Sequence, residues 1–551
     1  MWFKKGIKWQ LETDVLVVGT GGAGMTAALA AHAQGAKVIV IDKAPKVGGT
    51  TAVSGGVMWI PNNHHMAEAG VSDSREEALR YTRRLADGRS DEKLLETFLD
   101  FGPQMVKFIE ASTPLSLSAI KKYPDYHPEF DGGKPGARSL DPGIFDTNSL
   151  GAWKDRLRRS PIFGMTVMSV TEATDWGVFS NPLKLPWKQL GKRLSDGLTS
   201  SGGALCGGLL KGLLDKGIEP QLGVSARELV VDNGRVVGLR AEQNGRELLI
   251  GAKRGVVLAS GGFEWNKDLC AQFLGGQLTH PNSPPGNDGD GLRMVMALGA
   301  DLANMSEAWW CPSVVIPGEE YDGRQLNRGD FAIRSLPHSI IVNRRGKRFV
   351  NEAHNYNDMM KPFFDFDAVA YERPNLPAHL VLDQAFVEKY ALLTVVPGMA
   401  LPEWIIKADT LEELAAKIGV DARGLSETVT RFNDFAKDGV DKDFRRGESV
   451  YDHFYGDPAS TPNPNLGSIG KAPFYALQVH PGGLGTKGGA KVTPHAQVVK
   501  VDCETIPGLY AAGNVMAGVT GPGYPGAGAT IGTGMTFGYI AGAHAAQQRP
   551  A

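Results

Sequence analysis

Residues 14–42, which read DVLVVGTGGAGMTAALAAHAQGAKVIVID, decide the fold of this 551-residue chain. A short apolar run of strand length, DVLVV, leads directly into a G-x-G-x-x-G formed by Gly19, Gly21 and Gly24. An alanine-rich helix and a second strand follow, and that strand ends in Asp42. The glycine hexapeptide alone would be a weak signal, but the order strand, turn, helix, strand and acid indicates a dinucleotide-binding unit.

Each part of this unit has a physical role in holding a dinucleotide. Gly19 permits the tight turn, Gly21 lets the backbone approach the pyrophosphate, and Gly24 allows the helix to pack closely on the strand. The start of the helix offers free N–H groups and the positive end of its dipole to the phosphates. Asp42 can accept hydrogen bonds from ribose hydroxyls. We therefore expect a Rossmann-like α/β domain that starts close to residue 14.

A second loop of glycines and hydroxyl residues, GGTTAVSGG at 48–56, follows soon after the acid. It resembles the loop that wraps the pyrophosphate and the flavin edge in flavoproteins of the fumarate reductase and succinate dehydrogenase superfamily. The resemblance implies FAD rather than NAD. Members with covalent flavin carry a histidine in this loop, and none lies between residues 48 and 56 here, so the resemblance implies noncovalent FAD.

Two later parts of the chain resemble the same superfamily. Residues 217–262 read as short strands that end in a glycine pair, and Val224 falls where such flavoproteins bring a strand near the adenine. Residues 508–514 resemble the returning strand and turn, and a helix that begins near Ala529 would direct its N–H groups at the flavin. The cofactor-binding residues that the resemblance implies are Gly19, Gly21, Gly22, Ala23, Gly24, Asp42, Lys43, Gly49, Thr50, Thr51, Ser54, Gly55, Gly56, Val224, Gly261, Gly262, Gly513, Asn514, Ala529 and Ile531.

The same resemblance implies an α/β fold in which the Rossmann-like FAD-binding domain is discontinuous. Its first part is expected at 1–275 and its second part at 461–551. An inserted α+β domain at 276–460 would cap the cofactor and hold the substrate. Residues 136–200 look like an extra segment within the first part.

The loop GPGYPGAGATIG at 521–532 points to one family within the superfamily. Dicarboxylate reductases carry here an arginine that clamps a carboxylate, whereas this chain has Tyr524. The loop closely resembles that of the 3-ketosteroid Δ1-dehydrogenases, and the likeness covers almost the whole chain. The matching pieces are short, but their order and joint presence are specific. They are TTAVSGGVMWIPNN (50–63), YPDYHPE (123–129), SGGFEWN (260–266), the Trp309–Trp310 pair, VNRRGKRFVNEAHNY (342–356), LGTKGGAKV (484–492) and GYPGAGATIG (523–532).

The resemblance implies C1–C2 dehydrogenation of a 3-keto-4-ene steroid and assigns the site residues. Tyr524 and the backbone N–H of Gly528 would hold the C3 carbonyl and so acidify the C2 protons. Tyr356 would take a C2 proton, helped by Tyr126 or, as the alternative, by Tyr123. A free tyrosine has a pKa of about 10, so this base needs a partner that lowers its pKa. The hydride from C1 would go to flavin N5, and an external quinone or dye-like acceptor would reoxidise the flavin.

Two other functions remain open on the same scaffold. One is a flavin-dependent ene-reductase or a Δ4-steroid dehydrogenase, and the other is a flavin redox sensor without turnover. The intact Y-P-G-A-G loop (524–528) favours Δ1 chemistry, and the presence of all three candidate tyrosines speaks against a sensor.

Several conspicuous residues receive a plain structural interpretation. Trp309 and Trp310 are expected in the core, although they could line a flat apolar pocket. His480 is interpreted as structural or flavin-adjacent, because no partner arginine is evident. The basic residues of 344–348, which include Arg348, are expected in a solvated turn.

The basic and aromatic stretch 153–194 within the extra segment has two interpretations. It could be a lid that packs its apolar side on the FAD domain, or a surface that lies on an anionic membrane. A second insertion at 317–338 could reshape the mouth of the pocket. The basic residues of the stretch are Lys154, Arg156, Arg158, Arg159, Lys184, Lys188, Lys192 and Arg193, and its apolar residues are Ile162, Phe163, Met165, Val167, Met168, Trp176, Phe179, Leu183, Leu185 and Trp187.

Composition excludes several classes of protein. A net charge of -2 gives no electrostatic case for nucleic acid. The four cysteines lie far apart, which argues against a metal site and a disulfide framework. The N-terminal MWFKKGIKWQLE has no apolar core of signal-peptide length, and no run of 18 apolar residues exists. We expect a cytoplasmic protein, peripheral on the inner face of the membrane if the basic stretch docks there. The oligomeric state is left open.

Overall fold

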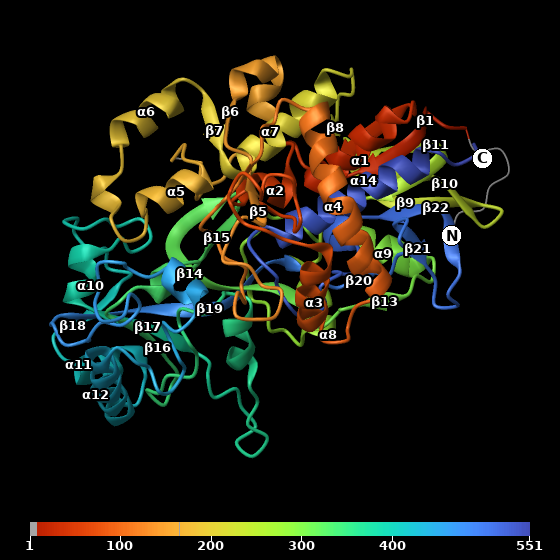
Figure 1. The fold of residues 1–551 in the computed structure, drawn as a ribbon. Coiled ribbons are helices and arrows are strands. Elements are labelled where there is room, and N and C mark those ends of the chain that lie inside the picture. The colour runs from red at the N-terminus through yellow and green to blue at the C-terminus, as the bar shows by residue number, and fades with distance from the viewer. Residues whose placement is uncertain (1–7, 165, 551) are drawn as a thin grey trace.

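The computed structural model describes residues 8–164 and 166–550. Residues 1–7, where the expectation about a signal peptide falls, lie outside the described residues, as do Met165 of the basic stretch and Ala551. Two large sheets dominate the fold, and the sheet near both chain ends lies on the right of Figure 1.

The first sheet combines strands from both ends of the chain. β1 pairs in parallel with β2 and β11, and β11 pairs in parallel with β22 from the C-terminal part. Residues 15–18 of β1 are buried on both faces, which explains why they form an uninterrupted apolar run. The strand order is β21-β22-β11-β1-β2-β8, with β10 attached to β11 and β9 attached to β10. The bounds are β1 (Leu11–Val18), β2 (Val38–Asp42), β8 (Gln221–Leu222), β9 (Val224–Asp232), β10 (Arg235–Gln243), β11 (Arg246–Leu258), β21 (Gln497–Val499) and β22 (Thr505–Ala511).

Two helices from opposite ends of the chain pack together on this sheet. α1 (Gly22–Ala33) lies against α14 (Ala529–Ala546), which Figure 1 draws in red and blue. Glycine makes this close approach possible, because a Cβ at Gly542 would lie 2.0 Å from the carbonyl oxygen of Ala27. The predicted fold class, a discontinuous Rossmann-like domain with an inserted α+β part, is confirmed. α4 (Glu92–Ser112) packs against α14, and α7 (Ser201–Leu214) packs against α1.

The second sheet belongs to the inserted part and has its own apolar core beneath two helices. That core includes Ile340, Val381, Leu425 and Phe432. β19 is its central strand, so the sheet takes in a strand that lies beyond residue 460, and the domain boundaries remain a prediction. The order is β15-β14-β19-β17-β16 with β12 and β18 attached to β19, and the bounds are β12 (His280–Pro281), β14 (Ala308–Tyr321), β15 (Arg324–Gly329), β16 (Ser339–Val342), β17 (Ala378–Asp383), β18 (Ile406–Ala408), β19 (Phe474–Thr486), α11 (Leu411–Ile418) and α12 (Ala422–Asp438).

Shorter elements connect the two sheets. β3, β5 and β4 form a small sheet, and β6–β7 and β13–β20 form two pairs. The bounds are β3 (Met58–Trp59), β4 (Ser118–Ala119), β5 (Ser139–Asp141), β6 (Ile144–Asp146), β7 (Leu198–Ser200), β13 (Leu302–Ala303), β20 (Gly489–Ala490), α2 (Gly49–Val53), α3 (Arg75–Ala86), α8 (Lys267–Leu274), α9 (Asp290–Ala297), α10 (Gln384–Lys389), α13 (Val450–Phe454), and the 3-10 turns η3 (Ile333–Ser335), η4 (Asp358–Phe364) and η5 (Gly513–Val515).

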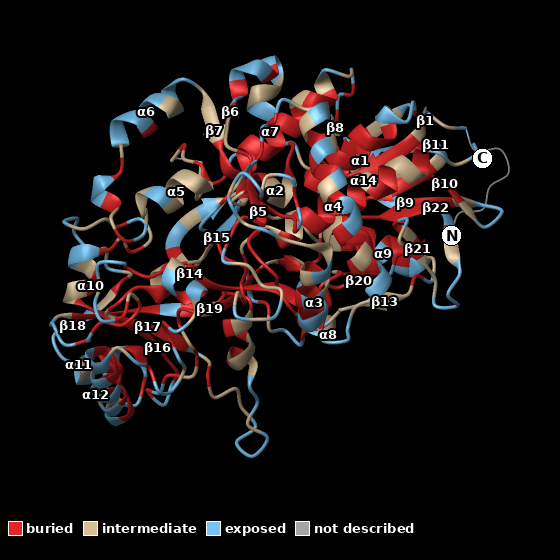
Figure 2. Cartoon of the chain, viewed as in Figure 1, coloured by how far each residue is buried: buried red, intermediate tan, exposed pale blue. Residues whose placement is uncertain are grey.

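The helices α5 and α6 of the extra segment 136–200 lie at the periphery, at the upper left of Figure 1, whereas β5 of the same segment pairs with β3 and β4 in the interior. Figure 2 shows that its helices are mainly exposed or half-buried. Phe179, Leu183 and Trp187 are exposed there. No helix within the described ranges is long and apolar enough to span a bilayer. Besides β5, β6 and β7, the segment contains η1 (Thr147–Arg156), α5 (Val170–Trp176), η2 (Pro182–Lys184) and α6 (Trp187–Ser195).

The predicted insertion at 317–338 forms much of a β-hairpin that reaches the extra segment. Its tip, between β14 and β15, carries Tyr321 and Asp322. Asp322 pairs with Arg158, and the Tyr321 hydroxyl donates a hydrogen bond to the Arg159 carbonyl at 2.8 Å. The hairpin therefore joins the inserted part to the extra segment at the cavity described next.

Candidate active site

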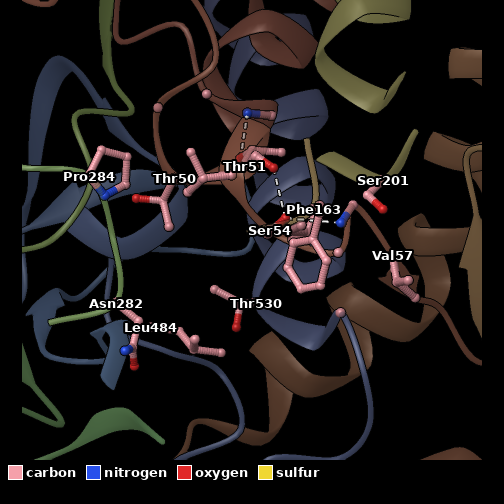
Figure 3. Close-up of a pocket in the computed structure, with 18 of the residues that line it drawn as sticks. Thr50, Thr51, Ser54, Val57, Phe163, Ser201, Asn282, Pro284, Leu484 and Thr530 are labelled. Carbon is pink, nitrogen blue, oxygen red and sulfur yellow. Dashed lines mark hydrogen bonds between the residues drawn. The ribbon is translucent and has the colours of Figure 1, made fainter. Parts of the chain in front are cut away.

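A cavity of about 530 Å³ lies where the carboxyl ends of β1 and β2 meet residues of the inserted part. Figure 3 shows hydroxyl and apolar side chains from both parts around it. Ile162, Phe163 and Phe179 of the extra segment also line it. The predicted cofactor-binding residues in its wall are Gly19, Gly21, Gly22, Ala23, Asp42, Lys43, Gly49, Thr50, Thr51, Ser54, Gly55, Gly56, Val224, Gly261, Gly513, Asn514 and Ile531, whereas Gly24, Gly262 and Ala529 are not part of the wall.

The glycine turn has the shape that a bound pyrophosphate needs. Gly19 has a φ of +115°, and a Cβ there would lie 2.3 Å from the Ala259 carbonyl oxygen. A Cβ on Gly24 would lie 2.0 Å from the Gly19 carbonyl oxygen, so this glycine sets how closely α1 packs on β1. Gly21, in contrast, has no backbone atom within 4 Å of its Cβ position, which meets only the Thr51 hydroxyl oxygen at 3.7 Å. The N-terminus of α1 is thus left accessible to an anion.

Asp42 is held at the end of β2 by the same turn. Its carboxylate accepts hydrogen bonds from the Thr20 backbone N–H at 2.8 Å, the Thr20 hydroxyl at 2.6 Å and the Ala44 backbone N–H at 2.9 Å. Thr51 of the second loop accepts the Gly22 N–H at 3.1 Å, which Figure 3 shows as a dashed line. The two loops therefore form one cradle, and its open glycines and helix N-terminus fit FAD.

Three tyrosines from distant parts of the chain meet at the other end of the cavity. The Tyr126 hydroxyl donates to the Tyr356 hydroxyl at 2.5 Å. The Tyr356 and Tyr524 rings meet edge to face, with centroids 5.6 Å apart, and the Tyr126 and Tyr524 centroids are 5.0 Å apart. Tyr356 and Tyr524 line the cavity, and Tyr126 lies behind them.

Tyr524 and Gly528 converge as carbonyl donors would. The Gly528 backbone N–H lies beside the Tyr524 hydroxyl, where it lowers the pKa of that phenol against the raising effect of burial. Gly528 has a φ of +91°, and a Cβ there would lie 2.1 Å from the Val57 carbonyl oxygen, so only glycine fits. Thr530 donates to the Tyr524 hydroxyl at 3.1 Å.

Burial works against the tyrosine base. It raises the pKa of Tyr356 well above its usual range, and the Tyr524 hydroxyl adds to that effect. The hydrogen bond from Tyr126 acts in the opposite direction. Tyr123 does not bond Tyr356; its hydroxyl lies 2.5 Å from that of Tyr455. Between the two candidates left open by sequence, Tyr126 is the one that contacts Tyr356.

Buried charges hold the loops that carry these tyrosines. Arg138 donates to Asp125 at 2.7 Å, and the Trp59 indole N–H donates to the same carboxylate at 2.7 Å, next to Tyr126. Burial would lower the pKa of His127, but Asp358 and Glu129 raise it to about 9, so His127 is a cation. His127 pairs with Asp358 at 2.6 Å and so links the two tyrosine segments.

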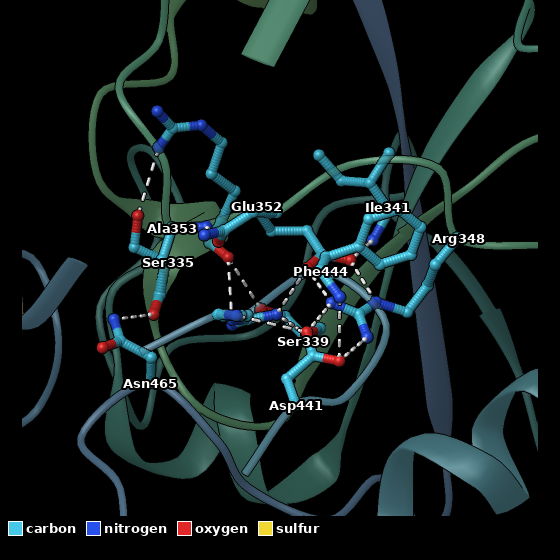
Figure 4. A network of polar contacts seen from close by, with 12 residues as sticks. Ser335, Ser339, Ile341, Arg348, Glu352, Ala353, Asp441, Phe444 and Asn465 are labelled. Carbon is cyan, nitrogen blue, oxygen red and sulfur yellow. Dashed lines mark hydrogen bonds and ion pairs between the residues drawn. The ribbon is translucent and has the colours of Figure 1, made fainter. Parts of the chain in front are cut away.

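A second buried network fixes the segment before Tyr356. Glu352 accepts hydrogen bonds from Arg348 at 2.7 Å and from Arg446 at 3.2 Å, and Asp441 accepts from Arg348 at 2.8 Å (Figure 4). The prediction that Arg348 lies in a solvated turn is wrong, since its residue exposure is 9%. Its neighbours Arg344 and Arg345 are exposed. Because buried and exposed residues follow one another irregularly in this loop, no periodic pattern in the sequence predicts which of its side chains are buried.

Other residues find simple places. Trp309 meets Tyr524 edge to face with centroids 4.7 Å apart, and Trp310 packs on Phe364 in the core. His480 stacks on His280, away from the tyrosines. Sequence reasoning missed Phe331 and Lys487, which lie against Tyr356 and Tyr524. It also missed Tyr455, whose hydroxyl bonds that of Tyr123. Lys487 stood in a quoted motif, LGTKGGAKV, but nothing in that motif predicts that its side chain turns inward.

Comparison with known proteins decides the family. The model of the FAD binding domain family matches residues 14–531. The chain is 40% identical to 3-oxosteroid 1-dehydrogenase of Mycobacterium tuberculosis, covering 98% of this chain and 99% of the relative. This chain belongs to the 3-oxosteroid 1-dehydrogenase family.

The relatives of this chain differ in the substrates that their names give. A 4-oxocyclohexanecarboxylate 2-dehydrogenase of Sinomonas cyclohexanicum is also 40% identical, over 96% of this chain and 92% of that protein. Among solved structures, the 3-ketosteroid Δ1-dehydrogenase of Sterolibacterium denitrificans in complex with 1,4-androstadiene-3,17-dione has a TM-score of 0.89 at 38% identity, covering 97% of this chain and 99% of that one. The fold of the 3-oxosteroid 1-dehydrogenase family is thus shared along the whole chain.

Proposed function

We propose that this protein is an FAD-dependent dehydrogenase that introduces the C1–C2 double bond into 3-keto-4-ene steroids. The observation that carries the proposal is the cluster of Tyr126, Tyr356 and Tyr524 with Gly528 at one end of a cavity whose other end suits FAD. The family supports it, because its members include 3-oxosteroid 1-dehydrogenases. FAD is held noncovalently by the two glycine loops.

In the proposed reaction the carbonyl is activated first. The Tyr524 hydroxyl and the Gly528 N–H donate to the C3 oxygen and stabilise the negative charge that develops there, as an oxyanion hole does. A C2 proton becomes acidic and passes to the Tyr356 oxygen, which must first give up its own phenolic proton to a neighbouring hydroxyl. When bound, FAD supplies the acceptor for the hydride that leaves C1. An external quinone or dye-like acceptor then takes the two electrons.

The Tyr356 proton needs a route away from the buried site. Tyr126 bonds Tyr356, and its own neighbour Tyr123 has a pKa raised by burial and lowered by the nearby hydroxyls of Tyr455 and Tyr126. Tyr123 and Tyr455 also line the cavity. Once the hydrogen bond between Tyr126 and Tyr356 reverses, this row of hydroxyls can carry the Tyr356 proton to Tyr455 in the cavity wall.

A monocyclic keto acid is the second candidate substrate, because a 4-oxocyclohexanecarboxylate 2-dehydrogenase is 40% identical. A carboxylate on the substrate would need a cation that is not already paired. Among the described residues that line the cavity, the cations are Lys43, paired with Asp288 and Asp290, and Arg158, paired with Asp322. The remaining wall is largely apolar, which favours the steroid.

The test is anaerobic mixing of the yellow protein with androst-4-ene-3,17-dione while the flavin absorbance is followed. Rapid bleaching with recovery of the 1,4-diene-3-one supports the proposal, whereas bleaching by 4-oxocyclohexanecarboxylate alone supports the second candidate. No bleaching by either ketone contradicts both and favours a reductase or a sensor.

Replacing Tyr524 with Phe tests the site within that reaction. The substitution removes one carbonyl donor, so kcat should fall by about 10²–10³-fold while FAD stays bound. Tyr475→Phe is the matched control, because the Tyr475 hydroxyl donates to Gln384 at 2.6 Å and neither residue lines the cavity. Normal turnover by Tyr524→Phe would contradict the carbonyl assignment.

We further propose that the extra segment is both a lid and a docking surface. Ile162 and Phe163 face the cavity, whereas Leu183 and Trp187 are exposed beside the lysines of η2 and α6. A lipophilic steroid reaches the enzyme from a membrane, so an anionic leaflet on the cytoplasmic side is the proposed contact.

A further inference from the structure

One buried cation lies directly behind the carbonyl-binding loop. Lys487, in the turn between β19 and β20, is only 1% exposed. Its ammonium donates hydrogen bonds to the backbone carbonyls of Pro522 and Gly523, both at 2.8 Å. These two residues come immediately before Tyr524. The side chain therefore ties down the chain segment that presents the phenol.

The same ammonium also acts on aromatic rings. It lies 4.4 Å from the ring centroid of Trp309 and 5.9 Å from that of Tyr524. The Trp309 ring in turn meets Tyr524 edge to face at 4.7 Å, and its N–H donates to Asn514 at 3.2 Å. A cation next to a phenol stabilises negative charge on the phenol oxygen, so it makes the hydroxyl a stronger donor.

Four charged groups act on Lys487, namely Glu307, Asp358, Lys361 and Arg89. Glu307 is the neighbouring carboxylate, and it is already paired with Arg89 at 2.7 Å and Lys361 at 2.6 Å. Asp358 of η4 is the second carboxylate that faces it. The pKa of Lys487 is lowered to about 7, mainly by burial and also by Lys361 and Arg89. The carboxylates of Glu307 and Asp358 act in the opposite direction and raise it.

We infer that Lys487 is the positioning residue for Tyr524: its ammonium fixes the Pro522–Gly523 backbone and, through the adjoining rings, strengthens the phenol as donor to the substrate carbonyl. The inference rests on the proposed function, because it concerns the step in which the ketone is polarised. Lys487 itself does not touch the substrate.

The charge of Lys487 makes the effect depend on pH. The group is charged below pH 7 and neutral above it, so the polarising charge is present at low pH and is lost as pH rises through about 7. The value of kcat/KM should therefore decline on the alkaline side of about pH 7. The decline in kcat/KM would then come from Lys487, which neither takes the substrate proton nor contacts the substrate.

The experiment compares Lys487→Met with the wild type, using androst-4-ene-3,17-dione between pH 5.5 and 9.5. Methionine keeps the length of the side chain but removes the charge and the donors. At pH 6 we expect kcat/KM to fall about 10- to 100-fold, less than the ~10²–10³ cost of losing a direct oxyanion donor, and the alkaline decline to disappear. Lys487→Arg keeps a charge at every pH, so it should restore part of the rate without the decline.

Two further variants keep the result interpretable. Lys442→Met removes a lysine that is 65% exposed and should leave rate and pH profile unchanged. Lys361→Met removes a cation that lowers the pKa of Lys487, so the alkaline decline should move to higher pH. Lys361 is 39% exposed, so this variant should fold even if Lys487→Met loses FAD.

Each outcome has a distinct meaning. A Lys487→Met enzyme with wild-type kcat/KM overturns the inference, and so does a slower one that keeps the wild-type decline, since packing alone would then explain the loss. An unmoved decline in Lys361→Met also overturns it. A wild-type enzyme that does not turn over the steroid overturns the proposed function, and this inference with it.

Discussion

At the scale of single residues, the chemistry depends on phenols in an unfavourable place. Burial raises the pKa of Tyr356 and of Tyr126, so neither is a base by itself at neutral pH. The short hydrogen bond between their hydroxyls lets the two residues share the proton that comes from the substrate. The buried cation His127 lies next to Tyr126 in the chain. Acid–base function here belongs to the hydrogen-bonded group rather than to one residue.

Removing the Tyr356 hydroxyl tests this directly. Tyr356→Phe should lower kcat by about 10²–10⁴-fold, the usual contribution of a general base, with little change in steroid affinity. Stopped-flow bleaching of the flavin measures the rate, and spectral titration with product measures binding. Tyr390→Phe is the control, because this buried tyrosine bonds Asp457 outside the cavity wall. An unchanged bleaching rate in Tyr356→Phe would rule out this base.

At the scale of elements, buried ion pairs fix the irregular segments between the sheets. Residues 353–357 form no regular structure. A catalytic side chain must nevertheless be held within about 0.5 Å of its productive position, and this applies to Tyr356. Glu352, fully buried, accepts hydrogen bonds from Arg348 and Arg446 and anchors this segment to the loop at Asp441. A loop with few backbone partners gains its rigidity from such side-chain networks.

Glu352→Gln should destabilise the fold more than an exposed charge removal. It removes the buried carboxylate that pairs with Arg446 and one of the two that pair with Arg348, so the free energy of unfolding should fall by about 3–5 kcal/mol. Chemical denaturation followed by fluorescence measures it. Glu427→Gln, which breaks an exposed pair with Lys347, should cost about 1 kcal/mol or less. Equal losses in both variants would contradict the role of the network.

The ion pairs of Glu352 with Arg348 and Arg446 also make the stability of the fold depend on pH. Burial alone would raise the pKa of Glu352, but Arg348 and Arg446 hold it below its usual range. A carboxyl whose pKa is lowered on folding contributes stability above its unfolded pKa and loses it as pH falls through the folded value. The difference in unfolding free energy between wild type and Glu352→Gln should therefore shrink at acid pH.

The extra segment is the second element with a testable role. Changing Lys184, Lys188 and Lys192 together to Glu should weaken binding to vesicles that contain phosphatidylserine, by more than about 100-fold if each lysine contributes about 1 kcal/mol. Co-sedimentation measures this. The matched control is the triple change of Lys407, Lys417 and Lys437 on the inserted part. If both triples bind alike, or the wild type ignores the vesicles, the segment is a lid only.

At the scale of the whole molecule, the cofactor domain closes only when the last part of the chain returns. β22 completes the first sheet beside β11, and α14 packs on α1. The cofactor cradle takes residues from both ends, since Gly21, Gly49 and Gly513 all line it. Binding of FAD should therefore stabilise the entire first sheet, by about 2.7 kcal/mol when free FAD is a hundred times its Kd.

Gly24→Ala tests the packing on which this closure depends. Its Cβ would lie 2.0 Å from the Gly19 carbonyl oxygen, so α1 must move away from β1. We expect a loss of about 1–3 kcal/mol in stability and a lower FAD content after purification. Gly191→Ala is the control, since no atom lies within 4 Å of its Cβ position, and FAD content should stay normal. Full FAD content in Gly24→Ala would contradict the close-packing argument.

The sequence alone determined the features that depend on a few neighbouring residues. The glycine turn at 19–24, the acid at the end of β2 and the hydroxyl loop at 48–56 act through backbone shape and spacing along a few residues, so they predicted the fold class and the cofactor. The Y-P-G-A-G loop likewise carried the family. These motifs can be recognised in the sequence because each is complete within one turn or one βα unit.

Only the tertiary structure decided which residues meet across long separations. It brought Tyr126 rather than Tyr123 to Tyr356, turned Arg348 inward while its neighbours stayed exposed, and placed Lys487 behind Tyr524. It also placed β19, which follows the predicted boundary at residue 460, in the second sheet. The physical reason is that the orientation of a side chain in an irregular loop depends on packing from other segments, and no periodicity in the sequence records it.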